Sequence, residues 1–315
     1  MQSWDLQRKI QVTQTRIIEW YQHYDGKVYV SFSGGKDSTV LLDLARRIYP
    51  DIEAVFVDTG LEYPEIRDFV KSKENVRWLH PEKYNRKTKQ YERYSFKQVL
   101  DDYGYPIISK EVSEAIYCAR SKPDGCRAKK FDPNSDYCKK YGKRFDLSKW
   151  TYLKDSDIPI SHMCCNVMKK APAKRYEKGT GNYAIIGTMT CEAQNRKREW
   201  LKTGCNGFNK KRPTSQPMSF WTEQDVLTYL RDFKIPYATV YGNIIENKNG
   251  KLKTSGVNRT GCMFCGFGVQ CEKEPNRFQQ MKITHPKQYD YCIKPIEENG
   301  LGMGKVLDYI GIKYK

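Results

Sequence analysis

SFSGGKDSTVLLDL, residues 31–44, is the stretch that decides the fold of this chain. A short apolar strand is predicted before it at 27–30, and the spacing of apolar residues predicts a helix over 38–48. A strand, a glycine-rich turn and a helix N-terminus together point a row of backbone N–H groups at an anion. The stretch lacks the G-x-x-x-x-G-K-[ST] pattern, so the predicted anion site is not a Walker A loop.

The turn itself carries side chains suited to phosphate. Two adjacent glycines allow close backbone approach, two serines add hydroxyl donors, a lysine adds positive charge, and an aspartate could cap the helix or help to hold a metal. The motif SGGKDS resembles the PP-loop of the ATP pyrophosphatases and the sulfonucleotide reductases. That resemblance implies an adenine nucleotide, here ATP with Mg²⁺, held by Ser31, Ser33, Gly34, Gly35, Lys36, Asp37 and Ser38, with Lys36 and Asp37 also catalytic.

The composition indicates a folded protein of the cytoplasm. Of its 315 residues, 39% are hydrophobic and 13% are aromatic, which argues against disorder. No apolar run approaches membrane-spanning length, and the first residues lack the apolar region of a signal peptide, so we expect no membrane partner. Eleven cysteines in such a chain favour metal or redox use over a disulfide framework.

The charge of the chain suggests a polyanionic partner. The formal net charge is +18, and in residues 82–155 basic side chains alternate with Tyr and Phe, a composition suited to binding phosphates and stacking bases. A Lys-rich surface with spread, solvated charge is the alternative. We expect nucleic acid, either DNA or tRNA, as the partner, and a homodimer is left open.

Further apolar runs predict an α/β fold with a doubly wound, mostly parallel sheet. The resemblance specifies this fold as adenine-nucleotide-hydrolase-like. We expect a nucleotide-binding domain over 1–235 with a basic insertion at about 82–155, and a C-terminal iron–sulfur lobe over 236–315. The additional buried strands are predicted at 53–57, 76–79 and 182–187.

Two segments outside the turn also resemble the family. VFVDTGLEYPEI is similar to the family's segment after its second strand, which implies that Asp58, Thr59 and Gly60 line the nucleotide. Parallel strands end at one edge of a sheet, where ligands of open α/β folds bind, so this placement is consistent with the fold. YGYPIISKE is similar to a segment in which a lysine, here Lys110, faces the substrate.

A third segment matches the family only in part. The family carries G-x-R-x-x-E-S-x-x-R after a later strand, and Gly187, Glu192 and Arg196 match it here. The match implies that Gly187 and Glu192 lie at the nucleotide and that Arg196 stabilises charge during catalysis. Met189 and Ala193 replace the family's Arg and Ser, which weakens the case for the usual phosphosulfate substrate.

Two cysteine pairs form the second predicted site, Cys164 with Cys165 and Cys262 with Cys265. Adjacent cysteines can both reach a multi-iron cluster, and C-x-x-C places two sulfurs on one metal or cluster edge. Four soft ligands suit zinc or a [4Fe–4S] cluster. The pattern CC-x-x-x-K-x-x-P resembles the iron–sulfur site of the adenylyl-sulfate reductases, which implies that these four cysteines ligate [4Fe–4S] and that Lys169 is a catalytic residue beside it.

The other cysteines are less informative. Cys271 follows the second pair closely and could replace one ligand. Sulfonucleotide reductases carry a nucleophilic cysteine in a C-terminal tail, whereas the final residues YIGIKYK contain none, so the reductase interpretation ranks second. The remaining thiols show no metal-binding pattern, and burial explains most of them: Cys118, Cys126, Cys138, Cys191, Cys205 and Cys292.

Three functions follow from these features. The first is an ATP-dependent sulfur-transfer enzyme that modifies nucleic acid, similar to the ATP-pyrophosphatase subunits of DNA phosphorothioation systems. It would adenylate an oxygen of its target, release pyrophosphate and insert sulfur supplied by a cysteine desulfurase. The second is a phosphoadenylyl-sulfate or adenylyl-sulfate reductase. The third is a non-enzymatic iron–sulfur protein that binds nucleic acid.

Overall fold

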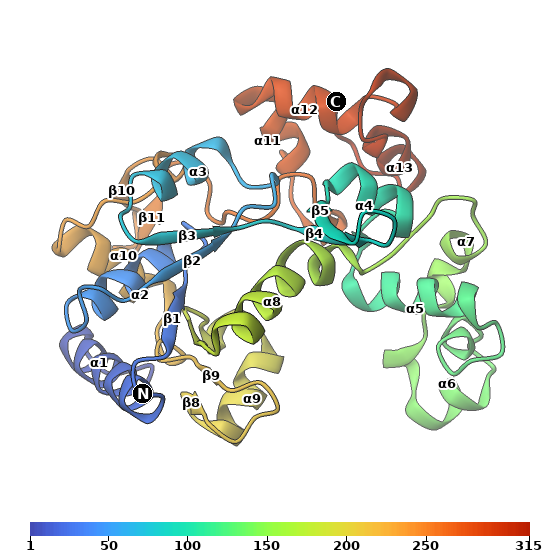
Figure 1. The fold of residues 1–315 in the computed structure, drawn as a ribbon. Helices are drawn as coiled ribbons and strands as arrows, with labels where there is room; N and C mark the ends of the chain where they lie inside the picture. Colours follow the sequence, from blue (N-terminus) through green and yellow to red (C-terminus); the bar gives the residue numbers. More distant parts are fainter. The chain divides into compact units, whose positions relative to one another are not determined.

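The computed structural model describes residues 1–315, apart from the side chain of Lys143. The chain divides into two compact units. Figure 1 shows the chain coloured by residue number. Unit 1 and unit 2 are both discontinuous along the chain. Unit 1 comprises Met1–Asp58, Glu62–His80 and Pro172–Gly261, and unit 2 comprises Thr59–Leu61, Pro81–Ala171 and Cys262–Lys315.

Unit 1 is built on a six-stranded sheet with the strand order β3-β2-β1-β7-β9-β8. Neighbouring strands from β3 to β9 pair in parallel, and the edge strand β8 pairs antiparallel with β9. The first strand is central and later strands extend the sheet on both sides, which confirms the predicted doubly wound, mostly parallel α/β fold. The strands are β1 (Val28–Ser31), β2 (Ala54–Val57), β3 (Val76–Leu79), β7 (Tyr183–Ile186), β8 (Asn206–Gly207) and β9 (Thr214–Ser215).

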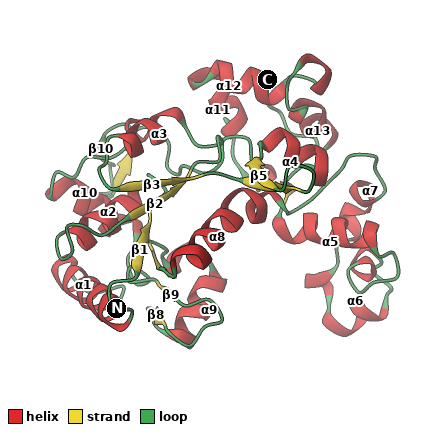
Figure 2. Cartoon of the chain, viewed as in Figure 1, coloured by secondary structure: helices red, strands yellow, loops and turns green.

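Helices cover both faces of this sheet (Figures 1 and 2). Alternation along β1 divides the core, because Val28 and Val30 join a large apolar cluster while Tyr29 joins a small one on the opposite face. The large cluster includes Trp20 of α1, and the small one includes Tyr176 of α8. The helices of this unit are α1 (Leu6–His23), α2 (Lys36–Arg46), α3 (Pro64–Lys71), α8 (Ala171–Thr180), α9 (Gln194–Thr203) and α10 (Glu223–Asp232).

A hairpin of β10 (Ile244–Glu246) and β11 (Leu252–Thr254) also belongs to unit 1. The side-chain amide of Gln224 on α10 fixes the hairpin, since it donates to the carbonyl of Leu252 and accepts from the N–H of Leu252, both at 2.9 Å. The hairpin is therefore fixed on α10 within the last segment of unit 1, Pro172–Gly261.

Unit 2 is mostly helical. The parallel pair β6–β12 places Gly266 opposite Ile107 and Phe267 opposite Ile108, so the segments 81–171 and 262–315 fold together. Its strands are β4 (Glu82–Asn85), β5 (Gln90–Arg93), β6 (Ile107–Ile108) and β12 (Gly266–Phe267). Its helices are α4 (Phe96–Tyr103), α5 (Lys110–Ser121), α6 (Asp136–Tyr141), α7 (Thr151–Lys154), α11 (Arg277–Thr284), α12 (Pro286–Ile293) and α13 (Met303–Tyr309).

Shorter helical turns complete the chain. One π-helical turn, Asn166–Lys170, follows the first cysteine pair. In the described part of the chain, no helix is both long enough and apolar enough to span a bilayer. The 3-10 turns are Ala128–Phe131, Lys143–Phe145, Ser148–Trp150, Thr190–Glu192, Thr239–Tyr241, Val269–Cys271 and Ile296–Glu298.

Candidate functional site

The predicted PP-loop joins β1 to α2 in unit 1. Ser31 ends β1, and Gly34 has a φ of +71°, a left-handed conformation that favours glycine. A Cβ on Gly34 would lie 2.8 Å from methyl carbons of both Ile66 and Val70 on α3. The loop therefore needs glycine here for two reasons, its backbone conformation and its packing against α3.

Serine hydroxyls brace the loop from inside. The N–H of Ser33 donates to Oγ of Ser38 at 3.2 Å, and the two serine hydroxyls are 3.1 Å apart. The Ser38 hydroxyl donates to the carbonyl of Gly35 at 2.9 Å. α2 begins at Lys36 directly after this loop, so its free N–H groups are presented there, as an anion site requires.

Lys36 is buried and fully engaged. Its ammonium donates to the carbonyl of Asn258 at 2.6 Å and lies 3.1 Å from a carboxylate oxygen of Glu223. The hydroxyl of Tyr241 accepts from the Lys36 N–H at 3.2 Å and is 2.7 Å from the hydroxyl of Thr260. These contacts tie residues 258–260 to the loop, and the Glu223 carboxylate would compete with a phosphate for the Lys36 ammonium.

Asp37 has the environment of a cation ligand. Its Oδ1 is buried and has no hydrogen-bond partner among the described residues. Burial raises the pKa of the Asp37 carboxyl, although the charges of Lys36, Arg259 and Arg196 act to lower it. A buried carboxylate oxygen without a partner fits a magnesium ion carried by a nucleotide.

Gly187 lets the end of β7 approach the start of α2. A Cβ on Gly187 would lie 3.3 Å from the backbone carbonyl oxygen of Asp37, tighter than ordinary packing. Met189, which replaces the family's arginine, is 2% exposed and belongs to the apolar core. The structure thus places Gly187 against the start of α2 and leaves no charged side chain at position 189.

Two arginines meet at Glu192 beside the loop. Arg196 donates to Glu192, and the guanidinium of Arg259 lies 3.5 Å from the other oxygen of that carboxylate. Burial lowers the pKa of Arg196, and the positive charge of Arg259 lowers it further. Sequence reasoning identified Arg196 and missed Arg259. No motif marks Arg259, and its position depends on the contacts that hold residues 258–260 at Lys36.

The Asp-Thr-Gly segment is divided between the units. Asp58 ends the first segment of unit 1 and accepts a hydrogen bond from the guanidinium of Arg67 at 2.9 Å. Thr59 and Gly60 belong to unit 2, where Oγ1 of Thr59 accepts from the N–H of Leu61 at 3.2 Å. Asp58 is therefore committed to Arg67 in this structure.

All four predicted cluster cysteines lie in unit 2. The sulfurs of Cys164 and Cys165 are 4.0 Å apart. The hydrogen bond from Cys164, together with the charges of Lys110 and Lys169, lowers the pKa of Cys165 to about 5 against the opposing effect of burial. The pKa of Cys164 is raised by the same hydrogen bond, by burial and by the charges of Cys165, Cys265 and Cys262.

The second cysteine pair is held by backbone contacts. Cys265 directly precedes β12, which pairs with β6, and its carbonyl accepts from the Arg277 guanidinium at 2.9 Å. Burial raises the pKa of Cys265, whereas the charges of Arg277 and Lys110 act to lower it. Cys271 is exposed and lies at the end of a 3-10 turn.

The donor set of unit 2 is more open than a single-ion site. Within the described residues, no group of three or more His, Cys, Asp or Glu is arranged to hold one metal ion. The four thiols nevertheless influence one another's ionisation, and two lysines face Cys165. Each cysteine of a [4Fe–4S] cluster binds a different iron, so the four sulfurs of a cluster site need not converge on one point as the ligands of a single zinc ion must.

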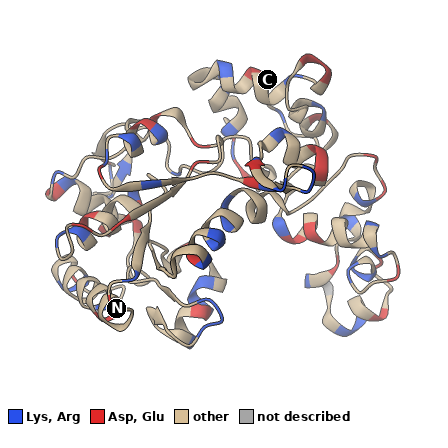
Figure 3. Cartoon of the chain, viewed as in Figure 1, with Lys and Arg blue, Asp and Glu red and all other residues tan. Residues whose placement is uncertain are grey.

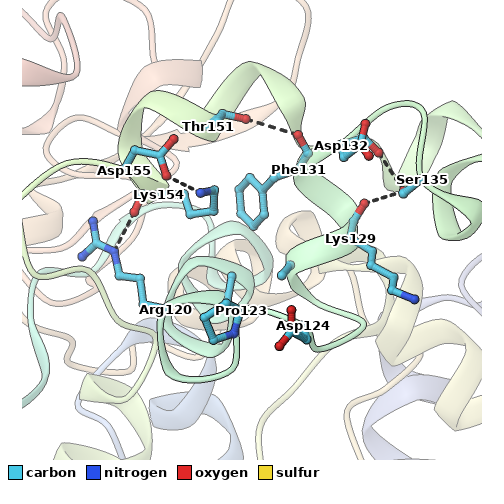
Figure 4. A pocket seen from close by; sticks show the side chains of 12 residues that line it. Arg120, Pro123, Asp124, Lys129, Phe131, Asp132, Ser135, Thr151, Lys154 and Asp155 are labelled. Atoms are coloured by element: carbon cyan, nitrogen blue, oxygen red, sulfur yellow. Dashed lines mark hydrogen bonds and ion pairs between the residues drawn. The ribbon is translucent and has the colours of Figure 1, made fainter.

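A separate hollow of about 830 Å³ lies within the basic insertion (Figure 4). Three of its charged groups have partners, because Lys154 pairs with Asp155 and the Arg120 guanidinium donates to the carbonyl of Lys154 at 2.9 Å. The insertion cysteines do not converge there: Cys138 is buried with its sulfur 3.6 Å from the carbonyl of Lys129, and Cys126 is exposed.

Comparisons with known proteins identify the family. The sequence profile described as the phosphoadenosine phosphosulfate reductase domain matches residues 27–105 and 120–266. The chain belongs to this family. It is 24% identical to the adenosine 5'-phosphosulfate reductase of Staphylococcus epidermidis over 226 residues, which are 70% of this chain and 68% of that protein. These findings confirm the resemblance seen at SGGKDS.

Two other similarities are broader in coverage. An uncharacterised protein of Methanocaldococcus jannaschii is 25% identical over 92% of this chain, and a second one is 25% identical over 86%. The chain spans only 53% and 41% of these two relatives. The crystal structure of phosphoadenylyl-sulfate reductase from Candida auris, a phosphate complex, matches with 15% identity and a TM-score of 0.41, covering 76% of this chain and 89% of that one.

Proposed function

We propose that unit 1 binds ATP through the PP-loop and that the chain is an ATP-dependent sulfur-transfer enzyme acting on nucleic acid. The observation that carries this proposal is the loop itself. Gly34 has a left-handed backbone conformation there, and the hydroxyls of Ser33 and Ser38 lie beside the start of α2. The buried Oδ1 of Asp37 has no hydrogen-bond partner among the described residues. Membership of a nucleotide-using family supports the same assignment.

The loop would act on the departing pyrophosphate. An oxygen of the target attacks the α-phosphorus of ATP, a new P–O bond forms, and the bond to the pyrophosphate bridging oxygen breaks. Negative charge then develops on pyrophosphate, where fixed N–H groups and cations stabilise it most. Lys36 would pair with this charge in competition with Glu223, and Asp37 would hold magnesium. Arg196 lies beside the loop and would stabilise the α-phosphate.

The cysteines would hold a [4Fe–4S] cluster. Cys164, Cys165, Cys262 and Cys265 are the proposed ligands, with Lys169 beside them. When bound, such a cluster supplies iron that can carry sulfur or electrons. Free cysteines throughout the chain are consistent with a reducing compartment, so we place the enzyme in the cytoplasm. We propose a cysteine desulfurase as its sulfur donor.

Nucleic acid is the proposed target because of charge. The net charge of +18 favours association with a polyanion, and the substituted 187–196 segment disfavours the usual phosphosulfate. In the second half of the reaction, the persulfide sulfur from the desulfurase would first take up two electrons from a thiol reductant, which leaves as a disulfide. The resulting sulfide-level sulfur would then bond to the activated atom as the bond between that atom and AMP breaks. DNA and tRNA are the two candidate targets, and the assay below distinguishes them.

Pyrophosphate release from ATP by anaerobically purified protein tests the proposal. We expect release that depends on either DNA or tRNA and that is lost when Lys36 and Asp37 are both replaced by alanine. The matched control replaces Asp68 and Lys71, an exposed pair on α3, and should retain release. Wild-type protein that binds its cluster yet releases no pyrophosphate with either nucleic acid would contradict the proposal.

A sulfonucleotide reductase is the second candidate. The similarity to the Staphylococcus epidermidis reductase over 70% of this chain favours it. In that case adenylyl sulfate or phosphoadenylyl sulfate with a thiol reductant would yield sulfite without any nucleic acid. Sulfite production together with absent pyrophosphate release would replace the first function by the second.

A further inference from the structure

Helix α9 of unit 1 has no buried residue along its length. It is held from one side, because its partly buried residues Arg196, Trp200 and Thr203 recur at helical spacing. Trp200 packs against the large apolar cluster of unit 1, and Arg196 donates to Glu192. The other positions of α9 are exposed. A helix that is held on one side only leaves most of its surface for solvent or for a partner.

The outer side of α9 is a positively charged stripe with one apolar residue at its centre. Lys197, Arg198 and Lys202 are exposed, and their side chains form no ion pair or hydrogen bond within the described part of the chain. Leu201 lies among them at helical spacing and is 69% exposed. Arg198 and Lys202 are four residues apart, where like charges repel each other across a helical turn. An anion bound to the stripe would remove this repulsion.

The chain itself supplies no counter-charge to the stripe. The one carboxylate of α9 is Glu199, and it lies 3.1 Å from the ammonium of Lys210. Lys211, on the loop after the helix, is exposed and also forms no ion pair among the described residues. Figure 3 shows Lys and Arg along α9 and on this loop. Exposed cations without carboxylate partners complement a row of phosphates.

The start of α9 lies beside the nucleotide site. Its N-cap is Ala193, which provides no side-chain hydrogen bond to the first N–H groups of the helix. Arg196 of the first turn donates to Glu192, and the guanidinium of Arg259 lies 3.5 Å from the same carboxylate. A helix start without a side-chain cap favours a phosphate. A chain of phosphates that follows α9 would therefore reach the residues beside the PP-loop.

We infer that α9 binds double-stranded DNA, with Lys197, Arg198 and Lys202 paired with backbone phosphates. This inference rests on the proposed function, since it names the surface that holds the nucleic-acid target. The stripe presents no aromatic ring on which an unpaired base could stack, whereas a duplex offers its phosphates without needing one. The major groove of B-form DNA admits an α-helix, but that of A-form RNA is too deep and narrow. In the DNA groove, Leu201 could contact the methyl group of a thymine.

Fluorescence anisotropy with a labelled DNA duplex tests the surface. Replacing Lys197, Arg198 and Lys202 together by glutamine should reduce the slope of log affinity against log salt by about 2.7, since each phosphate contact on B-form DNA contributes about 0.9. Leu201→Glu should weaken binding more than Leu201→Gln, because only the first places a negative charge within the stripe. None of these side chains is buried, so urea unfolding should be unchanged and the losses cannot be assigned to misfolding.

A basic hairpin of the same unit provides the matched control. The β10–β11 hairpin carries three exposed lysines, and their replacement by glutamine removes the same charge: Lys248, Lys251 and Lys253. This control should leave the affinity within about twofold, since salt screens exposed charges that lie away from the DNA. An equal loss from the helix and hairpin variants would reduce the effect to general charge and overturn the inference. Full affinity in the triple variant of α9, or binding of an RNA duplex or a single strand as tightly as the DNA duplex, would overturn it as well.

Two further outcomes separate this inference from the proposed function. Wild-type protein that releases pyrophosphate with tRNA but does not bind the DNA duplex would overturn the inference alone. Duplex binding that depends on α9, without pyrophosphate release under any condition, would support the surface and contradict the proposed ATP chemistry. If both hold, the triple variant of α9 should keep its affinity for ATP in calorimetry and lose the release that DNA stimulates.

Discussion

Gly34→Ala should destabilise unit 1 strongly, through a backbone contribution and a crowding contribution that can be measured separately. In the folded chain φ at this position is +71°, which costs a residue with a Cβ about 1–2 kcal/mol. The added Cβ would also lie 2.8 Å from methyl groups of Ile66 and Val70, which are 1% and 0% exposed. Crowding in a packed core costs about 1–3 kcal/mol more, so we expect a total loss of about 2–5 kcal/mol.

Urea unfolding followed by tryptophan fluorescence measures this loss. A Trp150→Phe background removes the tryptophan of unit 2, so the remaining signal reports unit 1, where Trp20 and Trp221 are fully buried. Gly181→Ala is the matched control, because Gly181 has a φ of +74° and a Cβ added there would meet nothing within 4 Å. It should lose only the conformational part, about 1–2 kcal/mol.

The difference in the loss of unfolding free energy between Gly34→Ala and Gly181→Ala measures the crowding against α3. Adding Val70→Ala to Gly34→Ala should make room for the new methyl group, so the double variant should lose less than the sum of the two single losses. Nucleotide affinity should fall with Gly34→Ala because the loop must shift. Equal destabilisation by Gly34→Ala and Gly181→Ala would refute the reasoning and leave the backbone conformation as the whole effect.

Glu223→Gln should tighten ATP binding about 2- to 5-fold in calorimetry, because it removes the carboxylate that competes with phosphate for Lys36. The Glu223 side chain is half-exposed, so its ion pair with Lys36 contributes no more than about 1 kcal/mol. Unchanged affinity would mean that Lys36 stays on the carbonyl of Asn258. Arg259→Gln should weaken ATP binding about 10-fold or more by removing a charged contact, with unfolding unchanged because this side chain is 66% exposed. Lys9→Met should destabilise unit 1 by about 3–5 kcal/mol in urea, since it removes the buried ammonium that lies 2.6 Å from the Asp225 carboxylate and leaves that charge unpaired. Cys262→Ser should reduce the visible absorbance and iron content of anaerobically purified protein, and an unchanged spectrum would exclude this thiol as a ligand.

The elements that the sequence predicts best depend on local pattern. The PP-loop follows from glycine, serine and lysine between two apolar runs, and the starts of α4 and α5 carry local signals of the same kind. Serines cap both of these helices through hydrogen bonds to backbone N–H groups three residues on. Such signals lie within a few residues of one another, so the sequence alone contains them.

The partners of the loop could not be predicted in the same way. Lys36 pairs with Asn258 and Glu223, and Arg259 meets Glu192, through contacts between residues far apart in the chain. No spacing rule links such positions, because they are joined by the packing of several elements. The same reason applies to the β10–β11 hairpin, which Gln224 on α10 fixes through contacts that no local pattern contains.

The division of the chain into units has a consequence for how the protein is made. The path passes from one unit to the other after residues 58, 61, 80, 171 and 261. During synthesis, unit 1 therefore cannot complete its sheet and helical cover until β7, β9 and α10 have emerged from the ribosome. In unit 2, β6 has no partner strand until β12 has emerged. Contacts of such long sequence separation form slowly and leave apolar surface open to chaperones and to aggregation. No single cut in the chain releases either unit intact, and the four cysteines proposed as cluster ligands are all present only late in synthesis.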